Sequence, residues 1–87
     1  MEYILKREEF KTGGVYLSSA VCILLNTFPG FIVENGRTLY VFPVSGRLYR
    51  AINQYNDGLQ LNAYQFAKMI KRLRGEMLAR RGAGVSR

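Results

Sequence analysis

The chain has 87 residues, of which 48% are hydrophobic and 13% aromatic, and its net charge at pH 7 is +7. This length has room for one small domain, and the hydrophobic content excludes a globally disordered protein. The chain has no histidine and a single cysteine, Cys22, which excludes an intramolecular disulfide and removes the commonest general base and metal ligand. No phosphate-loop or other catalytic motif is present, so we expect neither enzymatic activity nor a cofactor.

The positive charge lies almost entirely in the second half of the chain. Residues 1–44 contain as many acidic as basic side chains and are neutral. Residues 45–87 contain nine Lys and Arg against Asp57 and Glu76, so this half holds the whole net charge. Charge segregated in this way indicates a polyanionic partner.

The N-terminal residues predict a short strand or arm followed by a helix. Tyr3-Ile4-Leu5 fits either an edge strand or an ordered arm. After a break at Thr12-Gly13-Gly14, in which Thr12 is the expected N-cap, residues 15–26 have apolar side chains at helical spacing. Cys22 lies inside this apolar run, where the role of a buried small hydrophobe is favoured over that of a reactive thiol.

The same apolar run is too short to cross a membrane, which needs about 20 residues. The mixed charges that follow Met1 do not resemble a secretory signal peptide. Together with the lone thiol, these features lead us to expect a cytoplasmic protein.

A β-hairpin is the clearest structural signal. Asn35-Gly36 stands between the β-prone runs 31–34 and 37–42, which is typical of a type I′ turn. Glu34 and Arg37 then face each other across the strands. Period-two alternation divides the side chains into two faces. One face holds Phe31, Val33, Thr38, Tyr40 and Phe42, and the other holds Ile32, Leu39 and Val41.

The aromatic face of this hairpin has two interpretations. Exposed, Phe31, Tyr40 and Phe42 would form a stacking platform for the bases of single-stranded nucleic acid. Buried, they would cover the apolar stripes of the helices, because a two-stranded hairpin is not stable alone. We favour the buried interpretation.

Two further helices complete an α+β fold of one small domain, with the order helix, β-hairpin, helix, helix. Ser45 is the expected N-cap of a helix over 46–56, which Asn56-Asp57-Gly58 ends. Asn62 caps a third helix over 63–78, and residues 79–87 are expected to form a flexible basic tail. The domain therefore spans 1–78. The apolar side of the third helix consists of Ala63, Phe66, Ile70, Leu73 and Met77.

The opposite side of the third helix is basic. Lys68, Lys71 and Arg72 point away from the apolar side, and Arg74 lies on its flank. Arg80 and Arg81 extend the positive field into the tail. Such a stripe is suited to phosphates, but a solvated helix face would also be polar. The candidate nucleic-acid-binding residues are therefore Lys68, Lys71, Arg72, Arg74, Arg80 and Arg81.

A helix–turn–helix arrangement is an alternative for the last two helices. In that arrangement Tyr64, Gln65 and Lys68 would contact bases from the start of the recognition helix. The link over 56–62 is longer than the usual turn of three or four residues, so we favour the basic stripe.

The order of landmarks resembles a family of small domains found in bacteria, phages and prophages, which is catalogued only as a domain of unknown function. The resemblance covers about residues 10–78 and implies a compact α+β domain of mobile-element origin. It does not indicate which activity the domain has. This chain departs from the family at two acidic positions, which hold Gly13-Gly14 and Pro43-Val44. The landmarks are Thr12, Leu17, Ala20, Leu24, Gly30-Phe31, Arg37, Tyr40-Val41-Phe42, Tyr55, Gly58, Asn62, Phe66, Ile70 and Leu73-Arg74.

Two functions follow from these patterns. The first is a small nucleic-acid-binding accessory protein that contacts phosphates through the basic helix and tail, with DNA and RNA, single and double strands left open. The second is a protein-interaction module or homodimer, because eleven aromatic residues and an apolar second hairpin face exceed what one small core covers. No membrane or small-molecule partner is expected.

Overall fold

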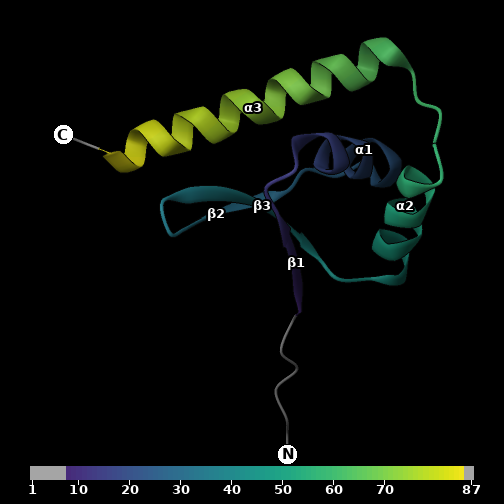
Figure 1. The fold of residues 1–87 in the computed structure, drawn as a ribbon, viewed down its shortest axis with the longest axis horizontal. Coiled ribbons are helices and arrows are strands. Elements are labelled where there is room, and N and C mark those ends of the chain that lie inside the picture. The colour runs from purple at the N-terminus through teal and green to yellow at the C-terminus, as the bar shows by residue number, and fades with distance from the viewer. Residues whose placement is uncertain (1–7, 86–87) are drawn as a thin grey trace, which may run out of the picture.

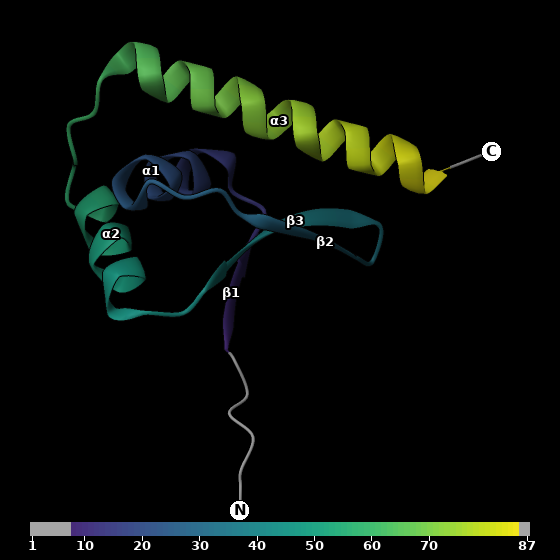
Figure 2. The same cartoon turned by 180° about the vertical axis from the view of Figure 1, so that it is seen from behind.

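The computed structural model describes residues 8–85 and has an α+β fold (Figure 1). Three antiparallel strands form a sheet in the order β1-β3-β2. Helix α1 packs between α2 and α3, and α3 extends over the hairpin, as the reverse view also shows (Figure 2). The elements in chain order are β1 (Glu9–Thr12), α1 (Val15–Leu25), β2 (Gly30–Glu34), β3 (Arg37–Pro43), α2 (Gly46–Asn56) and α3 (Ala63–Val85).

Strand β1 lies later in the sequence than the predicted N-terminal strand. Residues 3–5 lie outside the described part of the chain, whereas Glu9–Thr12 pair with β3. The signal for this strand is its alternation, since Phe10 and Thr12 are half-buried while Glu9 and Lys11 are exposed. Lys11 Nζ forms an ion pair with Glu34 Oε2 at 3.1 Å on the outer side of the sheet.

The hairpin is confirmed in its turn and its register. Asn35 and Gly36 have φ angles of 53° and 78°, as a type I′ turn requires. Glu34 pairs with Arg37, so each side chain lies on the face that the alternation predicted. Strand β1 pairs with the free side of β3 and gives the hairpin a third strand.

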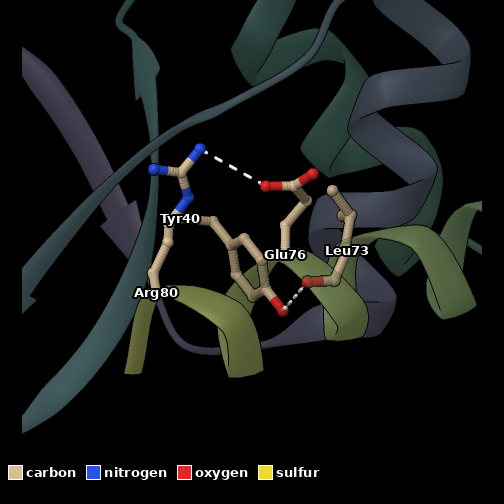
Figure 3. A network of polar contacts seen from close by, with 4 residues as sticks. All are labelled: Tyr40, Leu73, Glu76 and Arg80. Carbon is tan, nitrogen blue, oxygen red and sulfur yellow. Dashed lines mark hydrogen bonds and ion pairs between the residues drawn. The ribbon is translucent and has the colours of Figure 1, made fainter. Parts of the chain in front are cut away.

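The inner face of the hairpin forms the core, which confirms the buried interpretation of its aromatic residues. Tyr40 and Phe42 are 0% and 1% exposed, and they pack with Val21 and Cys22 of α1 and with Leu73 of α3. The Tyr40 hydroxyl donates to the Leu73 carbonyl at 3.4 Å (Figure 3). A buried tyrosine needs such a partner, so this contact helps to place α3 on the sheet.

Two predicted helix caps are confirmed. The Ser45 hydroxyl accepts from the Leu48 amide, and the Asn62 side-chain oxygen accepts from the Gln65 amide, each at 3.0 Å. The backbone turn at Gly58, with φ of 87°, follows α2 as expected.

Thr12 was wrongly predicted as the cap of the first helix. The N-cap of α1 is Gly14, which makes no side-chain bond. The Thr12 hydroxyl instead accepts from the Gly14 amide at 3.0 Å and closes the turn between β1 and α1.

Helix α3 does not end at Leu78 but continues to Val85, so most of the predicted tail is helical. Gly82 and Gly84 each cost a helix about 1 kcal/mol relative to alanine, which weakens a helix without forbidding it. Arg80 contributes to the extension through an ion pair with Glu76 at 3.4 Å (Figure 3) and through a cation–π contact with Phe31 at 4.3 Å.

The apolar side of α3 is rotated slightly from the predicted direction. Leu73 is fully buried, and Phe66, Ile70 and Met77 are half-buried, as expected. Ala63 is exposed instead, and Met69 packs against the core. The rotation occurs because α3 contacts α1 on one side as well as the sheet below it.

We predict that Leu73→Ala lowers the free energy of unfolding by about 3 kcal/mol, because it leaves a cavity between α3, α1 and Tyr40. Chemical denaturation of the purified protein measures this change. Leu78→Ala is the control, since Leu78 is 57% exposed on the same helix. Equal effects of the two variants would contradict the position of α3 on the sheet.

Candidate nucleic-acid interface

A groove of about 1080 Å³ lies between the C-terminal end of α1 and the first half of α3. Its lining includes three cationic side chains and no carboxylate. Aromatic rings and neutral polar groups make up much of the remainder. The residues that define this groove, called the basic groove below, are Cys22, Ile23, Asn26, Thr27, Phe28, Tyr64, Gln65, Lys68, Met69, Lys71 and Arg72.

The rotation of α3 determines which of its side chains reach the basic groove. Leu73 points into the core, and Met69 packs against the core while it also lines the groove. Lys68 and Arg72 each precede one of these residues by one position, about 100° around the helix, and lie one turn apart from each other. Lys71 lies three positions after Lys68 and one position before Arg72. The same packing that buries Leu73 therefore brings three positive charges to one wall of the groove.

Phe28 holds Arg72 in place. The chain leaves α1 through Asn26, whose left-handed backbone (φ of 52°) turns it towards Phe28. The Arg72 guanidinium lies 4.4 Å from the centroid of the Phe28 ring, a cation–π contact. Among the described side chains, no carboxylate is within ion-pair distance of Arg72. Its charge is therefore oriented by the ring without being neutralised.

Tyr64 is an exposed aromatic residue in the lining of the basic groove. It lies in the first turn of α3, which Asn62 caps, and it is 71% exposed. The Lys68 ammonium lies 5.1 Å from the centroid of its ring. A cation and an aromatic surface are thus adjacent at the groove, a combination used for phosphates and bases.

The six predicted binding residues do not form one surface. Lys68, Lys71 and Arg72 line the basic groove. Arg74 lies on the other flank of α3, with its guanidinium 5.7 Å from the Tyr16 ring. Arg80 points towards the hairpin and covers Phe31. Arg81 lies within α3, but its side chain is outside the described ones.

The position of Arg80 was detectable in the sequence. It follows Leu73 by seven residues and therefore lies on the same side of the helix. By contrast, the contribution of α1 and Phe28 to the groove was not detectable, because the groove joins segments that are far apart in the sequence.

The helix–turn–helix arrangement does not describe α2 and α3. Helix α1 packs against both of them, and they make little contact with each other (Figure 1). The side chains assigned to base contact in that arrangement, Tyr64, Gln65 and Lys68, instead line the basic groove.

Cys22 is a buried part of the groove wall and not a reactive thiol. It is 1% exposed, and burial raises its pKa to about 11, against a smaller lowering by the nearby Arg72. The thiol is therefore protonated at neutral pH, as expected for a core residue.

Comparisons of the chain with protein-family models, with curated proteins and with solved structures find no match. Within residues 8–85, no helix has the length and apolar sequence needed to cross a membrane. The same residues contain no cluster of three or more Cys, Asp or Glu side chains suited to a metal ion.

We predict that the burial of Cys22 makes the free energy of unfolding fall at alkaline pH. Its pKa rises from 9.0 when unfolded to about 11 when folded, so its contribution is complete below pH 9 and is lost as the pH rises towards 11. The measurement is chemical denaturation of the wild type and of Cys22→Ala at several pH values. The difference in unfolding free energy between them should shrink above pH 9, and a constant difference would contradict the burial of the thiol.

Proposed function

We propose that this protein binds nucleic acid and that the basic groove is the contact surface. The observation that carries this proposal is the convergence of Lys68, Lys71 and Arg72 on a groove whose lining has no carboxylate. A face that is merely solvated usually mixes charges of both signs. A groove with only positive charge attracts polyanions and concentrates them.

The charge and the fold favour nucleic acid over a single small anion. A groove of about 1080 Å³ is at the upper end of the range for small-molecule pockets, about 300–1,000 Å³. Its three cations are spaced along a helix, which suits consecutive phosphates of a polymer. Arg74 adds a further positive charge on the other flank of α3, whereas Arg80 is paired with Glu76.

We further propose that the protein is a cytoplasmic accessory protein of phage or mobile-element origin. The resemblance of residues 10–78 to a family of small phage and bacterial domains supports the mobile-element origin, and the lone Cys22 thiol supports the cytoplasmic location. A small basic domain fits a role in which binding itself is the function.

We predict that reversing two groove charges, Lys68→Glu with Lys71→Glu, weakens nucleic-acid binding at least about tenfold in low salt. Three phosphate contacts give a slope of log K against log salt of about −2 on a single strand, and loss of two contacts reduces its magnitude by about 1.4. Fluorescence anisotropy with a labelled oligonucleotide, repeated over a range of salt concentrations, measures both quantities.

The matched control is Arg47→Glu with Arg50→Glu. These residues are also three apart on an exposed helix face, on α2. Each double variant lowers the net charge from +7 to +3, since each reversal changes it by 2. If both variants weaken binding equally, overall charge and not the basic groove is responsible, and the proposed surface is wrong.

A second candidate function is self-association through the outer face of the sheet. The core lies mainly on the inner face. On the outer face Val41 is buried, whereas Ile32 and Leu39 are half-buried and do not belong to the core. Sedimentation of the wild type and of Ile32→Lys tests this candidate. A wild type that stays monomeric from micromolar to millimolar concentration would exclude it.

A further inference from the structure

The basic groove contains features that phosphate binding alone does not need. Tyr64 places an aromatic ring on the surface with 71% of the residue exposed, although burial of a ring is normally favourable. Phe28, which is 37% exposed, lines the same groove. Lysine and arginine would suffice to contact the backbone of a duplex.

The two rings are each paired with a groove cation. Lys68 lies 5.1 Å from the centroid of the Tyr64 ring, and Arg72 lies 4.4 Å from that of Phe28. In each pair a flat aromatic ring lies beside a positive charge, and the guanidinium of Arg72 is itself flat. Proteins that bind single strands combine these two elements, because bases stack on the planes while cations contact the backbone.

A duplex would gain little from these rings. Its bases already stack on one another, so their faces are not available to a protein ring unless the bases leave the stack. A single strand exposes its bases, and each base stacked on an aromatic side chain adds to affinity. The neutral groove residues Asn26, Thr27 and Gln65 also offer donors and acceptors for base edges.

We infer that the basic groove takes a short single-stranded segment of nucleic acid, with a base stacked on Tyr64 and phosphates on Lys68, Lys71 and Arg72. This inference rests on the proposed function and specifies its ligand. The chemistry is shared by DNA and RNA, since both present exposed bases on a phosphate backbone.

The test is fluorescence anisotropy with three labelled probes at one salt concentration. The probes are a thymidine 12-mer, a uridine 12-mer and a 12-base-pair DNA duplex. We expect at least one single strand to bind about tenfold more tightly than the duplex, and the two 12-mers distinguish DNA from RNA. A duplex that binds as tightly as both single strands would overturn the inference.

Substitution of Tyr64 tests the stacking contact itself. Tyr64→Ala should weaken binding of the preferred single strand about tenfold, whereas Tyr64→Phe should retain most of the affinity. Because stacking releases no counterions, the salt slope should stay unchanged in Tyr64→Ala, in contrast to the Lys68→Glu, Lys71→Glu variant.

The control for this substitution is Tyr49→Ala. Tyr49 is 50% exposed on α2 and does not line the basic groove. Since both tyrosines are exposed, neither variant should alter thermal unfolding by more than a few degrees. Equal affinities of Tyr64→Ala and the wild type would overturn the stacking contact.

The outcomes separate the inference from the proposed function. If none of the three probes binds in low salt, the proposed function fails, and the inference fails with it. If the probes bind through Lys68 and Lys71 but without preference for single strands or dependence on Tyr64, the proposed function stands and only the inference is wrong.

Discussion

The packing of Leu73 against Tyr40 is the contact on which the rest of the structure depends. It joins the middle of α3 to the central strand of the sheet, and both side chains are completely buried. The contact between the two side chains is otherwise apolar, and the hydrogen bond from the Tyr40 hydroxyl to the Leu73 carbonyl adds a directional interaction to it. Once Leu73 points at the sheet, the directions of the other described side chains of α3 follow from helical geometry.

That direction also decides which positive charges are available to a ligand. Lys68, Lys71 and Arg72 reach the basic groove, while Arg80 covers Phe31 beside the core. Arg72, although exposed, is oriented by Phe28. The helix therefore divides its basic residues between holding the fold together and presenting charge to solvent, a division that net charge alone does not reveal.

Local signals in the sequence predicted most of the elements. The Asn35-Gly36 turn, the Ser45 and Asn62 caps and the stop at Gly58 each depend on the chemistry of a few neighbouring residues, so they were found correctly. Two of the errors, in the end of α3 and in the position of β1, have a shared cause in tertiary contacts, whereas the Thr12 error arises from a local turn. Helix α3 continues beyond Leu78, where Arg80 contacts the hairpin, and β1 exists because β3 has a free edge that Glu9–Thr12 can pair with.

Only half of the candidate site could be predicted from the sequence, because the other half depends on tertiary contacts. The basic residues of α3 were evident from their spacing, but the groove needs the end of α1 and Phe28, which the fold brings together. Sequence reasoning treated the aromatic residues as either core or stacking platform. In the structure the two roles belong to different residues, with Tyr40 and Phe42 in the core and Phe28 and Tyr64 at the groove.

The most direct test of the central claim is an NMR titration of the isotope-labelled protein with whichever of the thymidine and uridine 12-mers binds more tightly. Amide shifts report the contact surface without any substitution. Binding at the basic groove predicts that the largest changes fall in residues 26–28 and 64–72. Changes confined to α2 or to the outer face of the sheet, or no changes in low salt, would contradict the account.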